Sequence, residues 1–414
     1  MKLFSTALFS GLITLVKLAA AFIVTKVVAL YIGAPGVAVV GSFTNFITIV
    51  LAFSNASINN GIVKYTAEYI NYPGKTQRLF STSFRISVAC SFFVSLILLL
   101  FSERISSLLF FSPFYSDVII VFAFTLVFYS LNQLLVSIVN GKSEIKLLTV
   151  INIIGSIISL IITVALVFYF GLKGALYALV LTQTLVFFIS YLIVFKKKWF
   201  TLSEFLHPFD KKMLHRLSAF TIMATISAIM VPVTQIAIRN TITSTLGIDN
   251  AGFWQGMMRI SDSYLMIANI ALATYFLPKF SQLRSRKEIK TELLNGYKLL
   301  VPFTVFSCIT LYFFRYPVIS LLFSSKFFPM SVLFKWQLLG DIFKVCAFVL
   351  SYLMLAKAKI KIYIITEVLF SAIYFVLSFF LIHSFGLEGT TMAFAVVYFL
   401  YFLCMLFLFL FELI

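Results

Sequence analysis

The sequence consists of apolar stretches that are long enough to cross a bilayer, separated by short polar connections. A membrane span needs about 20 mostly apolar residues, and each span must be a helix because lipid cannot satisfy open backbone groups. Of the 414 residues, 62% are hydrophobic and only 11% are charged, which excludes a soluble globular enzyme and a disulfide-rich secreted domain. The predicted fold class is an all-α polytopic membrane protein. Twelve transmembrane helices are expected, at residues 5–31, 36–62, 83–102, 117–140, 147–170, 174–195, 217–238, 251–277, 299–314, 331–356, 362–383 and 389–411.

Basic residues are unevenly distributed between the two sides of these spans. Of the 32 Lys and Arg residues, 22 fall on the side that holds both termini and 5 lie within spans. The other 5 fall on the opposite side, namely Arg104, Lys173, Arg239, Arg315 and Lys326. Because cytoplasmic connections carry the basic excess, both termini are predicted to be cytoplasmic. The net charge of +18 then reflects topology and contact with membrane phospholipids, and no nucleic-acid partner is expected.

The two halves of the chain repeat one another at a nearly constant offset. Segments 141–146, 170–174 and 105–110 match segments 356–361, 385–389 and 318–323. Six spans in each repeat give both halves the same orientation, so an axis along the membrane normal should relate them. We predict two pseudo-symmetric six-helix lobes, 1–195 and 217–414, around a central cavity. The cytoplasmic linker between them, 196–216, is expected to form an interfacial helix.

Two spans in equivalent positions of the repeats each carry a polar stripe along one face of an apolar helix. The stripes are Asn45, Thr48, Asn55 and Asn59 in the second span, and Gln255, Arg259, Asp262 and Asn269 in the eighth. Such a pair of stripes favours a hydrophilic cleft that is shared by the two repeats. The alternative is that these residues only form hydrogen bonds between helices.

Oppositely charged residues within the spans are spaced so that they can pair. Arg259 and Asp262 are three residues apart, as are Asp341 and Lys344 in the tenth span, with Gln337 on the same seam. A charge inside the bilayer is costly and usually faces an interior or a watery cavity. These carboxylates, together with Lys344, are candidates for proton coupling or for fixed counter-ions.

If those pairs neutralise each other, the remaining charges make the membrane interior net cationic. Lys17, Lys26 and Lys335 then face only Glu367, which also remains a candidate for proton coupling. A cationic interior suits an anionic substrate. Lys17 lies near the middle of its span and is the better candidate for an anion partner, whereas Lys26 is half a turn out of phase with it. Lys335 begins its helix and is expected at the interface.

No catalytic signature occurs in the chain. There is no metalloprotease or nucleotide-binding motif, and the four cysteines form no CxxC pair. We therefore expect no catalytic residues, no metal and no cofactor.

Several ordered motifs resemble those of Wzx-type flippases, from the polysaccharide-transport branch of the multidrug/oligosaccharidyl-lipid/polysaccharide superfamily. The resemblance covers the whole chain. Within the superfamily, the sequence is most similar to enterobacterial O-antigen and common-antigen lipid-oligosaccharide flippases. The motifs lie at residues 60–65, 252–256, 260–265, 275–278 and 334–345. Arg259 departs from the family pattern, where a small polar residue is expected.

The resemblance implies a function in the bacterial inner membrane. It implies that the chain flips an undecaprenyl-pyrophosphate-linked oligosaccharide, such as an O-antigen repeat unit, from the cytoplasmic to the periplasmic leaflet, alongside other O-antigen assembly proteins. Lys17, with Lys26 or Arg259, would hold the phosphates. Trp254 would join the sugar path together with the polar stripes and Gln337, although it could equally be packing.

Two other functions remain open. A cation-coupled multidrug exporter of the same superfamily would need an anionic cavity, which is the opposite sign. A membrane glycosyltransferase or polymerase would need a sizeable outer loop, and no long outer loop is expected here. The chain is therefore expected to be a transporter that works by alternating access, not an enzyme.

Overall fold

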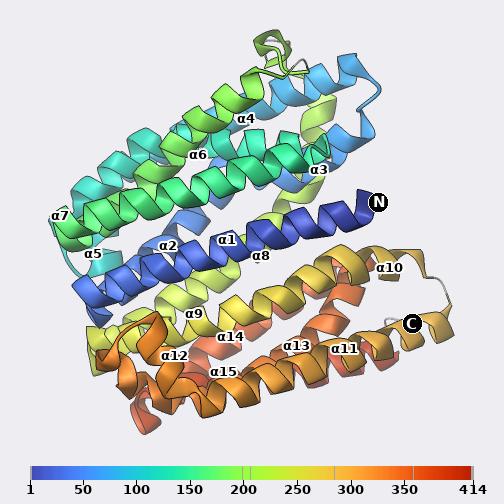
Figure 1. Cartoon of the computed structure of the whole chain (residues 1–414). Coiled ribbons are helices and arrows are strands. Elements are labelled where there is room, and N and C mark those ends of the chain that lie inside the picture. Colours follow the sequence, from blue (N-terminus) through green and yellow to red (C-terminus); the bar gives the residue numbers. More distant parts are fainter. Residues whose placement is uncertain (1, 198, 206, 284, 358, 412–414) are drawn as a thin grey trace. The chain divides into compact units, whose positions relative to one another are not determined.

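A computed structural model describes residues 2–197, 199–205, 207–283, 285–357 and 359–411, so Lys198 and Leu206 of the predicted linker lie outside the described part. All regular elements of this part are helical (Figure 1). They are α1 (Lys2–Tyr31), α2 (Ala34–Ser54), α3 (Asn59–Glu68), α4 (Pro73–Leu100), α5 (Ser102–Phe110), η1 (Pro113–Tyr115), α6 (Ser116–Gly141), α7 (Ile145–Phe195), η2 (Leu202–Phe205), α8 (Lys211–Leu246), α9 (Ile248–Ala271), η3 (Leu272–Phe276), α10 (Leu277–Gln282), α11 (Arg286–Phe313), α12 (Arg315–Leu322), η4 (Ser325–Leu333), α13 (Phe334–Ala356), α14 (Ile360–Phe385) and α15 (Glu388–Phe411).

The predicted fold class is confirmed. Among the described residues, ten segments are long and apolar enough to cross a membrane. One of them, Ile145–Phe195, contains two predicted spans that meet at Gly171, where the backbone is not helical. Together with α8, which corresponds to the seventh predicted span, these segments account for twelve crossings.

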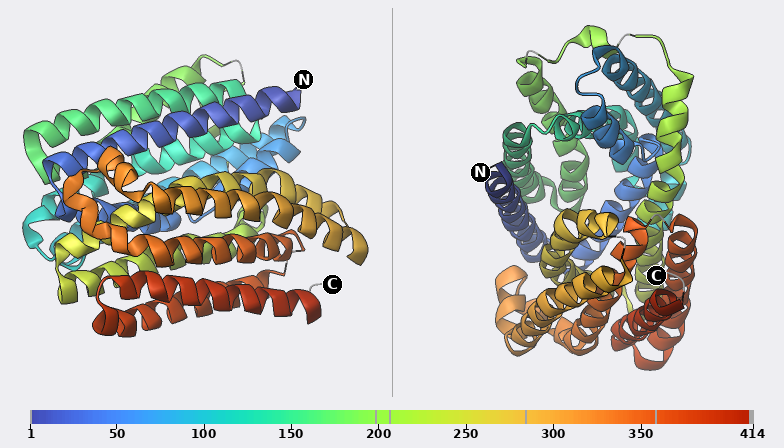
Figure 2. Two further views of the ribbon diagram at one scale, coloured as in Figure 1. Left: turned by 60° about the horizontal axis from the view of Figure 1, so that its bottom comes forward. Right: turned by 90° about the vertical axis from the view of Figure 1, so that its right-hand side faces the viewer.

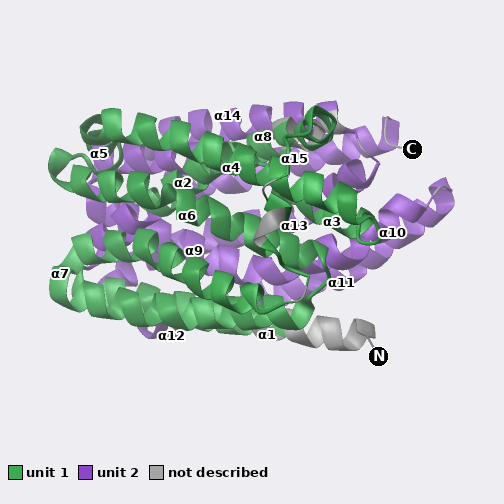
Figure 3. Cartoon of the chain, turned by 90° about the horizontal axis from the view of Figure 1, so that it is seen from above, with its two compact units in different colours: residues 1–32, 42–232 green, residues 33–41, 233–414 purple. Residues whose placement is uncertain are grey.

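The chain divides into two compact units (Figure 3). Unit 1 contains residues 1–32 and 42–232, and unit 2 contains residues 33–41 and 233–414. Two helices run through the boundaries, since α2 changes unit after Gly41 and α8 changes unit after Pro232. The predicted lobe limits, 1–195 and 217–414, stay a prediction.

In unit 1 the long helices pack side by side, in an order that differs from their order in the sequence. Helix α1 contacts α7, α7 contacts α6, and α6 contacts both α3 and α4. The linker is part of this unit, and Phe205 of η2 stacks on Phe80 of α4 with ring centroids 5.8 Å apart. Burial raises the pKa of Glu204 in the same turn, while nearby Lys142 acts in the opposite direction.

Polar contacts fix the end of the linker where α8 begins. Asp210 accepts hydrogen bonds from the N–H groups of Lys212 and Met213, at 2.8 and 3.2 Å, and so caps the helix. The backbone N–H of Asp210 donates to Thr82, and its carboxylate lies 3.6 Å from Arg78. The described linker residues form a 3₁₀ turn over Leu202–Phe205, and an interfacial position stays a prediction.

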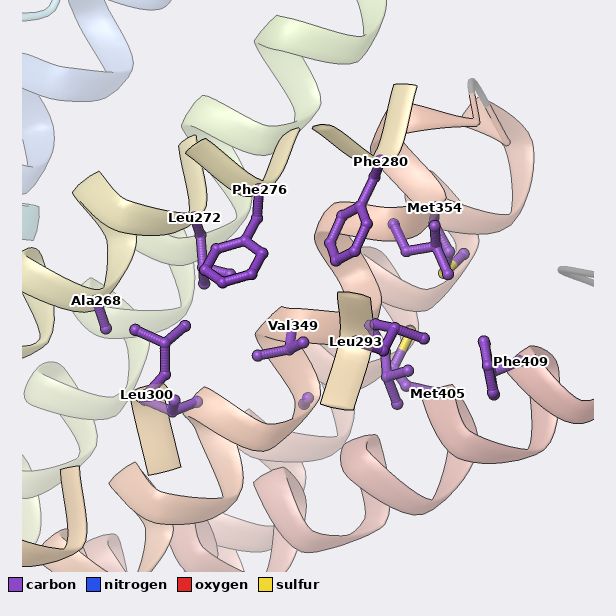
Figure 4. Close-up of a cluster of buried hydrophobic side chains, with 14 of the residues drawn as sticks. Ala268, Leu272, Phe276, Phe280, Leu293, Leu300, Val349, Met354, Met405 and Phe409 are labelled. Atoms are coloured by element: carbon purple, nitrogen blue, oxygen red, sulfur yellow. The ribbon is translucent and has the colours of Figure 1, made fainter. Parts of the chain in front are cut away.

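Unit 2 is built around α13, which contacts α11, α14 and α15 (Figure 2). Its buried core brings together side chains from α9, η3, α10, α11, α13 and α15. In Figure 4, Leu272 and Phe276 point from η3 toward the side of α13 that carries Val349, and Leu300 of α11 lies below them. The same core continues to Met405 and Phe409 of α15.

The local backbone geometry supports the internal repeat. Gly171 has φ 56° and ψ −130°, and Gly386, which lies 215 residues later, has φ 60° and ψ −139°. This region of the map is open almost only to glycine. Three residues after each of them, a Cβ at Gly174 or Gly389 would overlap the carbonyl of Leu166 or Leu381, which are themselves 215 residues apart.

Two predicted helices are interrupted in the structure. The expected single helix over 36–62 is wrong, because α2 ends at Ser54 and Ala56 and Ser57 have left-handed backbones with φ of 45° and 48°. The chain then restarts as α3 at Asn59. The expected helix over 251–277 changes to a π-helical turn at Leu272–Phe276 and continues as α10.

We expect Gly171→Ala and Gly386→Ala each to lower the free energy of unfolding by about 1–3 kcal/mol, since an alanine is strained at this φ and ψ. Equilibrium unfolding of the detergent-solubilised protein measures the effect. The control is Gly74→Ala, where the added Cβ meets nothing within 4 Å and the backbone is helical, so its stability should change little. A Gly386→Ala variant as stable as this control would contradict the interpretation.

Candidate functional site

A polar cavity of about 470 Å³ lies inside unit 1. It contains three members of the predicted stripe, namely Thr48 of α2, Asn55 in the turn after α2, and Asn59 of α3. Asn45 is half-buried in α2 and is not among the described residues that line the cavity. The cavity therefore gathers most of the predicted stripe, but from a broken helix and not from one helical face.

The break after α2 divides these side chains between two helices. The left-handed residues Ala56 and Ser57 interrupt the helix, so Asn55 lies in the turn and Asn59 at the start of α3 instead of on one continuous helix with Thr48. Asn55 is 1% exposed, and its side-chain carbonyl accepts a hydrogen bond from Ser130 of α6. Thr225 of α8 donates to Ser57 at 2.9 Å, which joins the turn to a further helix.

Sequence reasoning missed the other polar residues that line this cavity. Those of α6 and α7 include Gln133, Thr182 and Gln183, and further ones lie in α2, in the turn and in α3. The amide of Asn132 donates to the side-chain carbonyl of Gln183 at 3.2 Å and so links the two helices. The signal was available in the sequence, because adjacent amide and hydroxyl residues occur inside the otherwise apolar spans 117–140 and 174–195.

The two predicted lysines of α1 have different environments in unit 1. Lys17 is exposed on the helix surface, and Lys26 is half-buried. Arg259, the third predicted phosphate partner, belongs to α9 of unit 2, where it is half-buried. The structure thus places these three cations on two different units.

In unit 2 a buried carboxylate is surrounded by hydrogen-bond donors. Asp341 of α13 is fully buried and accepts from the Ser261 hydroxyl at 2.7 and 2.8 Å. The Tyr264 hydroxyl donates at 2.5 Å and the Gln337 amide at 3.2 Å. This network joins α9 to α13. Gln337 is itself fully buried, so its amide serves this network.

The charged pair in unit 2 differs from the pairs expected within single helices. Lys344 of α13 lies 3.9 Å from Asp262 of α9, which forms an ion pair between helices. The Lys344 ammonium also lies 5.4 Å from the ring centroid of Tyr398. Asn269 of α9 and Glu367 of α14 are both half-buried.

A buried arginine that the sequence analysis assigned to an outer connection belongs to this charged region. Arg239 is 1% exposed because α8 continues to Leu246, beyond the predicted end of the span at residue 238. Its guanidinium donates to the Gln255 side chain and lies 5.4 Å from the ring of the fully buried Trp254. No glycine or proline occurs between 239 and 246, which was the sequence signal for a longer helix.

Two glycines allow the start of α9 to approach α2. A Cβ at Gly41 would overlap the side chain of Gln255, and a Cβ at Gly252 would overlap the carbonyl of Ala34. Both contacts lie within unit 2. Trp254 and Gln255 are therefore held by the local backbone as well as by Arg239.

Comparison with known proteins identifies relatives over nearly the whole chain. The family model described as polysaccharide biosynthesis protein matches residues 38–332. The chain is 31% identical over 402 residues to a lipid III flippase from Escherichia coli (strain K12) and to one from Shigella flexneri, with 97% of each chain covered.

Solved structures share the fold at low sequence identity. An inward-facing multidrug resistance MATE family transporter of the MOP superfamily has a TM-score of 0.78 at 15% identity, with 97% of this chain and 94% of that chain covered. The lipid II flippase MurJ, in an inward closed conformation, has a TM-score of 0.74 at 16% identity, with 98% and 87% covered. At this identity these structures show a shared fold, and the predicted resemblance to lipid-linked oligosaccharide flippases is confirmed by the family model and the lipid III flippases.

We expect Gln255→Leu to lower the free energy of unfolding by about 1.5–3 kcal/mol, because the buried Arg239 guanidinium loses a hydrogen-bond acceptor. Equilibrium unfolding in detergent measures the loss. Gln255→Glu keeps an acceptor and should restore most of the stability. The matched control is Gln282→Leu, at an exposed position at the end of α10. Equal stability of Gln255→Leu and this control would contradict the prediction.

Proposed function

This chain belongs to the polysaccharide biosynthesis protein family, and from this premise we propose that it is a lipid-linked oligosaccharide flippase. Its substrate is an undecaprenyl-pyrophosphate-linked oligosaccharide, such as an O-antigen repeat unit. The protein moves it from the cytoplasmic to the periplasmic leaflet of the bacterial inner membrane, with both termini in the cytoplasm. The observation that carries the proposal is the similarity to lipid III flippases along 97% of the chain.

The polar head of such a substrate is what requires a protein. The lipid tail can remain in the bilayer, whereas the sugar and the pyrophosphate would lose their hydration in hydrocarbon. A wet path with hydroxyl, amide and cationic groups replaces that hydration. Alternating access between two six-helix lobes would expose this path to one leaflet at a time.

The cations are the proposed partners of the pyrophosphate. Lys17, Lys26 and Arg259 are the candidates, because charge-assisted hydrogen bonds to phosphate are stronger than neutral ones. The inside-negative membrane potential favours outward movement of an anion, by about 2.3 kcal/mol per charge per 100 mV. In this mechanism the potential contributes to the direction of transport.

The carboxylates of unit 2 are proposed as counter-ions or proton carriers. Asp262 has Lys344 as its partner at 3.9 Å, which supports a counter-ion role. Asp341 accepts three side-chain donors and is the better candidate for a proton carrier, since protonation would reorganise the contact between α9 and α13. Glu367 is a further candidate on α14.

The first test is complementation of bacterial strains that lack a defined flippase, each of which reports on one lipid-linked oligosaccharide. We expect this chain to restore surface polysaccharide in at least one strain. Retention of the substrate on the cytoplasmic face without the protein, and its release with the protein, is the result that flipping requires. Efflux of cationic dyes without complementation would favour a drug exporter, and accumulation of unpolymerised units on the periplasmic face would favour a polymerase.

The second test addresses the phosphate partner. We expect Lys17→Ala to lower the rate of flipping in the complemented strain by roughly 10- to 100-fold, as loss of a hydrogen bond to a charged group predicts. Lys17→Arg should retain most of the rate. The matched control is Lys335→Ala, at an exposed position at the start of α13. Normal flipping by Lys17→Ala at normal protein level would exclude Lys17 as the partner.

A further inference from the structure

The cavity inside unit 1 is lined by neutral polar groups from four helices and the turn after α2, with apolar side chains between them. Its walls come from α2, from the turn and α3 that follow it, and from α6, α7 and α8. None of the described residues that line it carries a charge. Its polar lining consists of amides such as Asn59 and Gln183 and of hydroxyls such as Thr48 and Ser159. This chemistry differs from that of unit 2, where arginine, lysine and aspartate lie together.

Two polar atoms at this cavity are buried without a partner among the described residues. They are the side-chain nitrogen of Asn55 and the hydroxyl of Thr182. Both residues line the cavity, and they are only 1% and 2% exposed. A buried polar group without a partner is costly, so a polar ligand that hydrogen-bonded to these two groups would remove that cost.

The donors are also held in place before any ligand binds. The Ser130 hydroxyl donates a hydrogen bond to the side-chain carbonyl of Asn55. This bond fixes the orientation of the amide, and therefore the direction of its nitrogen, which has no partner among the described residues. In the same way, the Asn132 amide donates to the side-chain carbonyl of Gln183, and the side-chain nitrogen of Gln183 can act as a donor. Tyr129 contributes an aromatic surface to the same cavity. Positioned donors combined with an aromatic surface are typical of a binding site and not of packing alone.

We propose that this cavity is a binding site for an uncharged sugar ring of the transported oligosaccharide. A sugar ring supplies hydroxyl groups that both donate and accept, and these match the amides and hydroxyls of the lining. A phosphate or an acidic sugar would bring a charge into a site without a cation, which is unfavourable. The inference rests on the proposed function and adds to it a neutral sugar site located within unit 1 alone.

The test uses the full-length protein in lipid nanodiscs and saturation-transfer NMR with soluble probes. The probes are the neutral disaccharide N,N′-diacetylchitobiose, glucuronate and inorganic pyrophosphate. We expect saturation transfer to the disaccharide, and neither anion should displace it. The variants Thr182→Val and Gln183→Leu should each weaken the binding of the disaccharide about three- to tenfold, as the loss of one hydrogen bond predicts.

The matched control is Thr149→Val, on the same helix. Thr149 is buried, but its hydroxyl bonds to the carbonyl of Ile145 at 2.8 Å, outside the cavity. Equal binding by the control and by the cavity variants would overturn the proposal, as would absence of transfer to the disaccharide or its displacement by pyrophosphate. Water alone would then fill the cavity.

Flipping assays with the same variants separate this proposal from the proposed function. If the unaltered chain complements a flippase-null strain while the cavity variants bind the disaccharide normally, the sugar site is refuted and the flippase function stands. If the unaltered chain fails in every strain but the cavity variants lose the disaccharide, the flippase assignment falls and the sugar site stands.

Discussion

Moving an unpaired polar group from water into hydrocarbon costs roughly several kcal/mol, and this cost constrains every part of the chain. Backbone groups escape it by forming helices, which is why the described residues of the spans are helical almost without interruption. Charged side chains escape it by finding partners, as Lys344 does with Asp262 between α13 and α9. Two polar atoms, at Asn55 and Thr182, have no partner among the described residues, and both residues line the cavity of unit 1.

The two units share the same backbone geometry at one pair of span connections. The breaks at Gly171 and Gly386 have nearly the same φ and ψ, and the helix that follows each break packs against an equivalent carbonyl of the helix before it. Each break ends one span and starts the next with almost no connection. A backbone conformation that almost only glycine adopts is thus required twice, at positions 215 residues apart.

Hydropathy and periodicity were sufficient to predict the all-helical fold class and most of the spans, because burial of apolar length in lipid fixes those features. They were not sufficient for the cavity of unit 1. The stripe from Asn45 to Asn59 was predicted on one helix, whereas the helix is interrupted at Ala56 and Ser57. The Asn, Ser and Gly residues clustered over 55–61 were the turn signal, which the hydropathy of the segment outweighed in the prediction. Arg239 was assigned to a connection because hydropathy ends a span at a charge, although packing with Trp254 and Gln255 carries the helix further.

The side chains of the two units differ although the backbones repeat, and this difference bears on transport. Neutral amides and hydroxyls line the cavity of unit 1, whereas the corresponding span of unit 2 carries Arg259 and Asp262. Hydrogen bonds between neutral groups exchange readily with water, and each contributes little net affinity. A sugar held by such bonds binds selectively and still leaves easily. A transporter must release its cargo, so strong charge contacts are best confined to the few cations that we propose as partners of the pyrophosphate.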